Sequence, residues 1–242
     1  MSETPLVEIE RHDGWAAIVL NRPERKNALT GPLIDAVADA VDGLSDDQSV
    51  AAVVLRGSGG AFCSGIDLTE LQAVPQHDWV PHFAASTRRM HIALFRCACP
   101  IVVALERYGI NAGTSLALSG DLVIAGETSF LQVGEIQQGA AIPMNAAWLR
   151  LKSTEQVMAR LALIGDRVPA PELHRLALVH EVVADDAVRT RAEELAHRFA
   201  SFPDGSSRTI KASMRAHLAI DPDTWFVSSS NNALLQAEQL RR

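Results

Sequence analysis

The chain has 242 residues, of which 22 are Lys or Arg and 29 are Asp or Glu, so its formal net charge is −7 at neutral pH. This length suffices for one α/β domain with a large core, and an acidic balance without any basic block argues against nucleic acid as a partner. The longest apolar runs fall far short of the roughly 18 residues that a membrane helix needs, so we predict core strands and no membrane span.

The first half of the sequence alternates between apolar runs of strand length and amphipathic helices. Residues 15–20 (WAAIVL) and 50–55 (VAAVVL) predict buried strands, and residues 30–44 between them carry apolar side chains at helical spacing. Thr30 fits the N-cap of this helix and Pro32 fits its first turn.

Further along the chain, strands and crossover helices continue to alternate, which predicts an α/β fold with a buried, largely parallel sheet covered by helices. The rest of the sequence is mainly helical. The further predicted elements are an irregular segment at 72–82, a helix at 83–98, strands at 101–105 and 121–125, a small-residue helix between them, a Gly-rich turn region at 133–143 and a short apolar piece at 180–184.

The domain organisation follows from a change of composition near Asp186. Residues 1–185 predict one α/β core, and residues 186–242 are typical of charged amphipathic helices that serve packing or subunit contacts.

The amino terminus and the cysteines bear on the cellular compartment. MSETPLVEIE is acidic and lacks the apolar segment of a secretion signal. The chain has three cysteines, Cys63, Cys97 and Cys99, which is an odd number, and their spacing is unlike that of zinc ligands. We therefore expect reduced, partly buried thiols and a cytoplasmic protein. A redox or metal role and a nucleophilic Cys63 are the alternatives. No other spacing predicts a metal site, and there is no GxSxG elbow.

Two small-residue turns follow predicted strands. Residues 55–71 (LRGSGGAFCSGIDLTEL) form a Gly-rich loop without the third glycine of a dinucleotide fingerprint, and Asp67 suits a helix N-cap better than a catalytic role. Residues 111–118 (NAGTSLAL) open a second helix. Unpaired backbone N–H groups at two such turns could together bind one developing oxyanion.

Four segments stand out by their order and spacing: NRPERKNAL (21–29), AFCSGIDL (61–68), NAGTSLALSGDLVIA (111–125) and EIQQGAAIP (135–143). Together they resemble the enoyl-CoA hydratase/isomerase (crotonase) superfamily, most closely its 3-enoyl-CoA to 2-enoyl-CoA isomerase branch. The resemblance covers about residues 7–200 and implies a crotonase-like spiral of ββα units with a helical C-terminal region. It also implies an acyl-CoA thioester as partner, a homotrimer or dimer of trimers, and no cofactor beyond the coenzyme A of the substrate.

The resemblance places the two oxyanion-hole N–H groups at Ile66 and Ala112. It also implies that His77 to Trp79 and Phe83 border the acyl pocket. Glu106 and Arg107 stand where the family often has Asn-Gly. The residues that the resemblance implies for binding coenzyme A are Arg25, Lys26, Ala28, Ser64, Ile66 and Leu68.

The hydratase branch uses two glutamates, and this sequence retains one. Ser115 occupies the first position, and Glu135 occupies the second, preceded by Gly134 instead of the usual Pro. A lone Ser hydroxyl is a poor base, whereas one carboxylate can take the α-proton of a 3-enoyl thioester and return it to the γ-carbon. We therefore predict an isomerase with Glu135 as proton shuttle and Ser115 as a packing residue.

Three alternatives remain open from the sequence. The chain could be a hydratase in which Ser115 positions water for Glu135. It could be an acyl-CoA-binding protein without catalysis, or a hydrolase or decarboxylase that uses the same oxyanion hole.

Overall fold

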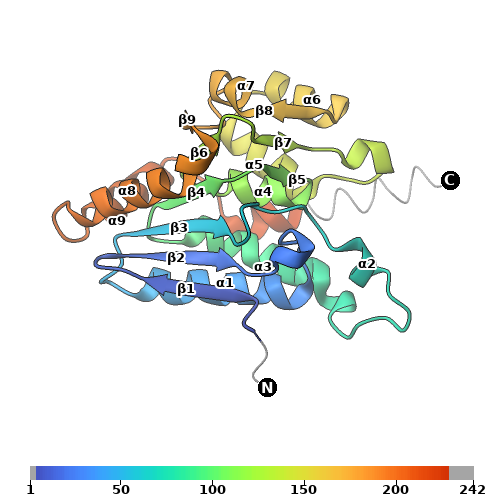
Figure 1. Cartoon of the computed structure of the whole chain (residues 1–242), viewed down its shortest axis with the longest axis horizontal. Coiled ribbons are helices and arrows are strands. Elements are labelled where there is room, and N and C mark those ends of the chain that lie inside the picture. The colour runs from blue at the N-terminus through green and yellow to red at the C-terminus, as the bar shows by residue number, and fades with distance from the viewer. Residues whose placement is uncertain (1–3, 229–242) are drawn as a thin grey trace.

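The computed structural model describes residues 4–228 and contains a six-stranded sheet and a three-stranded sheet (Figure 1). The large sheet has the order β1-β2-β3-β4-β6-β9. β1 is antiparallel to β2, and the other pairs are parallel, which confirms the predicted largely parallel sheet. Its strands are β1 (Val7–Arg11), β2 (Trp15–Leu20), β3 (Ala52–Gly57), β4 (Ile101–Leu105), β6 (Leu122–Gly126) and β9 (Glu181–Val183).

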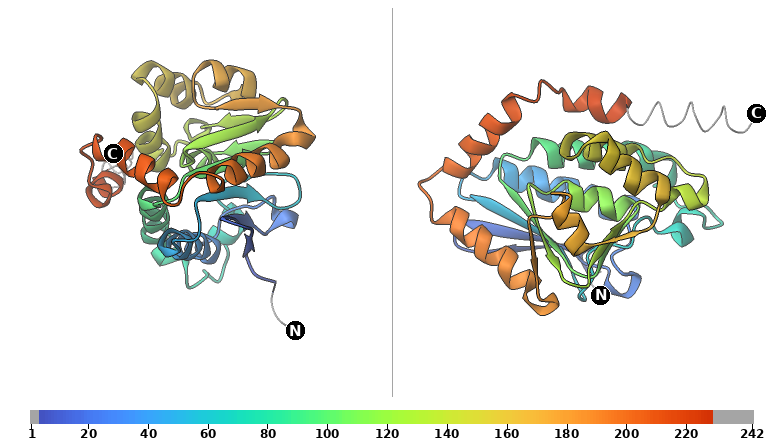
Figure 2. Two further views of the ribbon diagram at one scale, coloured as in Figure 1. Left: turned by 90° about the vertical axis from the view of Figure 1, so that its left-hand side faces the viewer. Right: turned by 90° about the horizontal axis from the view of Figure 1, so that it is seen from above.

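Helices cover both faces of the large sheet (Figure 2). Successive residues of β2 point to opposite faces, so Ile18 and Leu20 pack with α1 (Gly31–Asp46) and α3 (Phe83–Arg96), whereas Ala17 and Val19 face α8 (Val188–Ala200). The unbroken apolar runs of the sequence are thus explained by burial on both sides.

Two predicted helix starts are confirmed. The Thr30 hydroxyl accepts a hydrogen bond from the Leu33 N–H at 3.4 Å, as an N-cap does. The Asp67 carboxylate accepts one from the Glu70 N–H at 3.2 Å, and α2 (Leu68–Leu71) follows it for a single turn.

The smaller sheet was not predicted from the sequence. It has the order β5-β7-β8, from β5 (Tyr108–Ile110), β7 (Phe130–Gln132) and β8 (Arg167–Pro169). Beside it lie α4 (Ala112–Leu118) and α5 (Pro143–Lys152), which pack against each other. The predicted turn region at 133–143 contains a short 3₁₀ helix, η3 (Glu135–Gln138). The remaining helices are η1 (Pro23–Arg25), η2 (Val80–His82), α6 (Glu155–Ile164), α7 (Ala170–Arg175), η4 (Asp185–Ala187) and α9 (Ser206–Ala216).

The C-terminal region packs back onto the core in three places. In α9, Ser207 Oγ donates to the Ala51 carbonyl at 2.7 Å and Lys211 Nζ donates to the Cys99 carbonyl at 2.8 Å. α8 belongs to the core of the large sheet. Residues 222–228 are helical and place Phe226, which is fully buried, against Trp148 with the ring centroids 5.4 Å apart. The boundary at residue 186 and the role in subunit contacts stay predictions, and residues 229–242 of that region lie outside the described residues.

Within residues 4–228, no helix combines the length and the apolar character that crossing a bilayer requires. The cytoplasmic location stays a prediction.

Candidate active site

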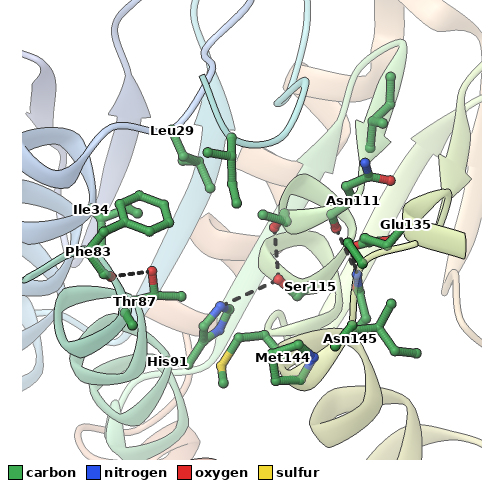
Figure 3. Close-up of a pocket in the computed structure, with 18 of the residues that line it drawn as sticks. Leu29, Ile34, Phe83, Thr87, His91, Asn111, Ser115, Glu135, Met144 and Asn145 are labelled. Carbon is green, nitrogen blue, oxygen red and sulfur yellow. Dashed lines mark hydrogen bonds between the residues drawn. The ribbon is translucent and has the colours of Figure 1, made fainter. Parts of the chain in front are cut away.

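A cavity of about 580 Å³ lies between α3 on one side and α4, η3 and α5 on the other (Figure 3). Its lining is mostly apolar, which suits a hydrocarbon chain. Phe83 lines it as expected, whereas His77 and Trp79 do not. The residues of the predicted site that line the cavity are Ser64, Ile66, Leu68, Ala112, Ser115 and Glu135.

The backbone around Ile66 directs its N–H away from a neighbouring segment. The Gly65 carbonyl accepts a hydrogen bond from the Leu29 N–H at 2.7 Å, and the Asp67 N–H donates to the Leu29 carbonyl at 2.9 Å. Carbonyl and N–H of one trans peptide point in opposite directions, so the Ile66 N–H points away from Leu29. It has no acceptor within the described part of the chain.

The Ala112 N–H is left free by the start of α4. The Asn111 carbonyl turns toward the helix and accepts from the N–H groups of Thr114 at 2.9 Å and Ser115 at 3.3 Å. The Ala112 N–H, on the other side of the same peptide, is one of the groups that a helix start cannot pair internally. Among residues 4–228 it has no acceptor either.

The two loops that carry these N–H groups are held together directly. Ile110 donates its N–H to the Cys63 carbonyl at 3.2 Å. Gly65 has a φ of 96°, and a Cβ there would lie 2.8 Å from the Ile110 carbonyl oxygen, so only glycine permits this approach. The spacing of the two free N–H groups is thereby fixed by backbone contacts.

Asn111 adopts an unusual backbone conformation, with φ 53° and ψ −114°. Such a conformation costs a non-glycine residue on the order of 1–3 kcal/mol and persists only where neighbours hold it. Here the Asn111 N–H donates to the Gln132 carbonyl at 2.7 Å, and its Oδ1 accepts from the Gly134 N–H at 2.8 Å. The glycine in place of the family's usual Pro therefore supplies a hydrogen bond that Pro could not donate.

Glu135 begins η3 beside this turn, and its carboxylate is only half satisfied. Oε1 accepts from Asn145 Nδ2 at 2.9 Å, and Asn145 Nδ2 also donates to the Asn111 carbonyl at 3.0 Å. Oε2 is buried and has no partner among the described residues. Burial raises the pKa of Glu135 above its ordinary value of 4.5, against the lowering effect of its own N–H and of Asn145. Sequence reasoning did not identify Asn145 as a partner of Glu135.

Ser115 and His91 form a buried chain of hydrogen bonds at the floor of the cavity (Figure 3). Trp148 Nε1–H donates to His91 Nδ1 at 2.9 Å, so the proton of the neutral imidazole is on Nε2. His91 Nε2 lies 3.4 Å from Ser115 Oγ, which itself donates to the Ala112 carbonyl at 2.8 Å. Burial lowers the pKa of His91 to about 3. This pair is not a nucleophile and its base, because His91 offers a proton to Ser115.

Three of the predicted coenzyme A ligands, Arg25, Lys26 and Ala28, do not line the cavity. Arg25 Nη2 forms an ion pair with Asp67 Oδ1 at 2.9 Å, Lys26 is exposed, and Ala28 is buried. Asp67 also pairs with the buried Arg22 at 3.2 Å, an interaction that sequence reasoning missed.

Two other features of the sequence are resolved by the structure. Arg107 has a φ of 59°, so it takes the left-handed position that glycine favours, and the turn between β4 and β5 forms without the usual Asn-Gly. The three cysteines are free but more buried than expected, with Cys63 fully buried. Burial raises the pKa of Cys63 to about 12, which argues against a nucleophilic thiolate.

Comparison with known proteins gives matches over nearly the whole chain. Residues 10–234 match the enoyl-CoA hydratase/isomerase family. The 1,2-epoxyphenylacetyl-CoA isomerase of Escherichia coli (strain K12) is 28% identical over 222 residues, which cover 89% of this chain and 83% of that protein. The enoyl-CoA hydratase EchA19 of Mycobacterium tuberculosis (strain ATCC 25618 / H37Rv) is 29% identical over 194 residues, covering 78% of this chain and 72% of that protein.

Among solved structures, an enoyl-CoA hydratase/isomerase from Xanthobacter autotrophicus Py2 superimposes with a TM-score of 0.85 at 28% identity. The match covers 95% of this chain and 86% of that one. The part of the sequence that matches the family includes every residue that lines the cavity.

Proposed function

The chain belongs to the enoyl-CoA hydratase/isomerase family, and we propose that within it this protein converts a 3-enoyl-CoA into the 2-enoyl-CoA with Glu135 as proton shuttle. The family match and the likeness in structure confirm the expected crotonase fold of ββα units with C-terminal helices. The protein is therefore an acyl-CoA enzyme of the crotonase superfamily. Its particular reaction, its substrate and its assembly as a trimer or dimer of trimers belong to the proposal.

In the proposed reaction, the thioester oxygen accepts hydrogen bonds from the N–H groups of Ile66 and Ala112. Glu135 Oε2 removes a proton from the α-carbon, and the electron pair moves onto the thioester oxygen to give a dienolate. The same carboxyl group then returns the proton to the γ-carbon, and the double bond ends between the α- and β-carbons. Loss of one oxyanion-hole donor costs about 3–4 kcal/mol in other enzymes, which is why backbone groups alone can carry much of this chemistry.

The observation that carries the proposal is the state of Glu135 Oε2. Among the described residues that line the cavity, Glu135 is the only carboxylate. Its Oε2 is buried without a partner, and its pKa is raised by burial. A carboxylate with a raised pKa is a stronger base and holds the proton more readily during transfer.

The hydrogen bonds of Ser115 favour isomerisation over hydration. A hydratase would need Ser115 to hold or deprotonate water. Its hydroxyl proton is already donated to the Ala112 carbonyl, and its neighbour His91 is neutral with the Nε2 proton facing it. No group that contacts Ser115 in the described chain is placed to accept its proton as a base.

The test is the ultraviolet absorbance of the conjugated thioester after mixing the protein with 3-enoyl-CoA substrates whose acyl chains carry no charge. Glu135→Gln should bind the thioester but lose turnover by about 10²–10⁴-fold, the range of general acid–base catalysis. Ser115→Ala is the matched control and should keep more of the activity than Glu135→Gln does. Unchanged turnover in Glu135→Gln would refute the shuttle, and product labelled from isotopic water at the β-carbon would instead favour the hydratase. Tight binding without any conversion would favour the inactive binder.

A further inference from the structure

Arg88 is a charged residue on the wall of an otherwise mostly apolar cavity. It lies on α3 and is partly buried. Among the described residues that line the cavity, Arg88 is the only one with a permanent positive charge.

The other arginines of α3 all have acidic partners. Arg89 Nη2 lies 2.5 Å from Asp39 Oδ1 and 3.2 Å from Asp42 Oδ2. Arg96 Nη2 lies 2.5 Å from Asp223 Oδ2. Arg88 has neither an ion pair nor a hydrogen bond of its guanidinium within residues 4–228. A guanidinium is well suited to bind a carboxylate through two parallel hydrogen bonds, and that of Arg88 is not used by another side chain of the described residues.

Arg88 lies on the side of the cavity that the acyl chain of a bound thioester would occupy. Figure 3 shows Phe83, Thr87 and His91 of α3 across the cavity from Glu135. Arg88 adjoins Thr87 on this helix and lines the same cavity. The basic residues expected to meet the coenzyme A phosphates, Arg25 and Lys26, lie outside the cavity. Ser64, Ile66 and Leu68, which were also expected to bind coenzyme A, line the cavity as well. In the proposed reaction the acyl chain extends from the thioester into the space beside α3.

We propose that the preferred acyl chain ends in a carboxylate that pairs with Arg88, so that the substrates are coenzyme A monothioesters of dicarboxylic acids. This inference rests on the proposed function because it assumes an acyl-CoA with its thioester oxygen between Ile66 and Ala112. It adds the substrate class, which the oxyanion hole and Glu135 leave undetermined.

The experiment is isothermal titration of the protein with saturated thioesters, which cannot isomerise. Pairs of equal length are compared: glutaryl-CoA with pentanoyl-CoA, adipyl-CoA with hexanoyl-CoA, and suberyl-CoA with octanoyl-CoA. At the length that reaches Arg88, the diacid thioester should bind about 10- to 100-fold more tightly, as expected for hydrogen bonds between charged groups.

Arg88→Met should abolish this preference while leaving the affinities for hexanoyl-CoA and free coenzyme A unchanged, and Arg88→Lys should retain part of it. Arg89→Met is the matched control, because Arg89 adjoins Arg88 but does not line the cavity, and it should leave the preference intact. The comparison of diacid and monoacid in the unmodified protein tests the proposal even if Arg88→Met does not fold.

Equal or weaker binding of the diacid thioesters at every length would overturn the proposal. An equal loss of free coenzyme A affinity in Arg88→Met would also overturn it, because Arg88 would then serve a coenzyme A phosphate. Binding is measured without turnover, so a diacid preference together with failure to isomerise 3-enoyl-CoA substrates both with and without a terminal carboxylate would refute the proposed reaction and support the carboxylate site.

Discussion

The hydrogen bond between Gly134 and Asn111 leads to a prediction that a double-mutant cycle can test. Gly134→Pro deletes the N–H that Asn111 Oδ1 accepts at 2.8 Å. A part-buried acceptor left without its partner costs about 1–3 kcal/mol. Gly134 has a φ of −95°, somewhat outside the range that Pro adopts, so the ring adds a smaller strain of its own.

In an Asn111→Gly background, Gly134→Pro should lower the free energy of unfolding by much less. Glycine has no Oδ1 to leave unpaired, and it adopts the positive φ of position 111 without the strain that Asn bears there. The strain of the Pro ring then remains, together with the close contact of its Cβ with Gln132 Nε2, 3.2 Å away. The two substitutions should therefore be coupled by about 1–2 kcal/mol, with the double variant more stable than the sum of the single effects predicts.

The measurement is urea unfolding of the four proteins at one fixed protein concentration, because any oligomerisation would make the apparent stability depend on concentration. A coupling of this size corresponds to a few degrees in melting temperature for a chain of this length. An equal cost of Gly134→Pro in both backgrounds would show that the hydrogen bond does not hold Asn111, and the explanation given for the missing Pro would be wrong.

Three further predictions concern ionisable groups. A carboxyl group whose pKa is raised on folding contributes stability below its unfolded pKa that is lost as pH rises through the raised value. Glu135→Gln should therefore unfold at higher urea concentration than the parent at pH 8, with the difference shrinking toward pH 4, and a less stable variant at pH 8 would contradict this. For His91 the folded pKa is lowered from 6.5 to about 3, so stability should fall as pH drops below about 6.5, by up to about 1.4 kcal/mol per pH unit. His91→Gln, which keeps an acceptor for Trp148, should flatten that slope in unfolding experiments between pH 6 and pH 4, and an unchanged slope would show that His91 is not its source. The thiol of Cys63, buried and with its pKa raised to about 12, should react with a disulfide reagent only on unfolding, and rapid labelling of Cys63 in the native protein, located by mass spectrometry, would refute this.

The fold could be predicted where burial imposes a pattern on the sequence. β2 and β3 are buried on both faces, so each reads as a continuous apolar run that sequence analysis recognises as a strand. β5, β7 and β8 have three residues each, too few to show a period, and they exist because they pair with one another across the chain. The smaller sheet was missed for this reason.

The same distinction separates the site residues that sequence motifs indicate from those that only tertiary contacts bring together. The predicted roles of Glu135, Ile66 and Ala112 rest on segments that keep the order and spacing of the family, and the structure shows that all three residues line the cavity. His91 could not be predicted in this way, because a histidine on the apolar face of a helix has the same local sequence whether it packs or takes part in a site. The partnership of Asn111 with Gly134 spans 23 residues and depends on β5 and β7 lying side by side, which no local pattern encodes.

The departures from the two-glutamate pattern meet at Ala112, at the two peptide groups on either side of its Cα. Ser115 Oγ donates to the Ala112 carbonyl, on the far side of the residue whose N–H is free. Asn111, which precedes that N–H, is held through Gly134 and through Asn145, and Asn145 also binds Glu135. The hydroxyl of Ser115 thus contacts the backbone next to the proposed oxyanion site. These contacts support the proposed isomerisation, a reaction that needs one carboxylate and a fixed backbone donor.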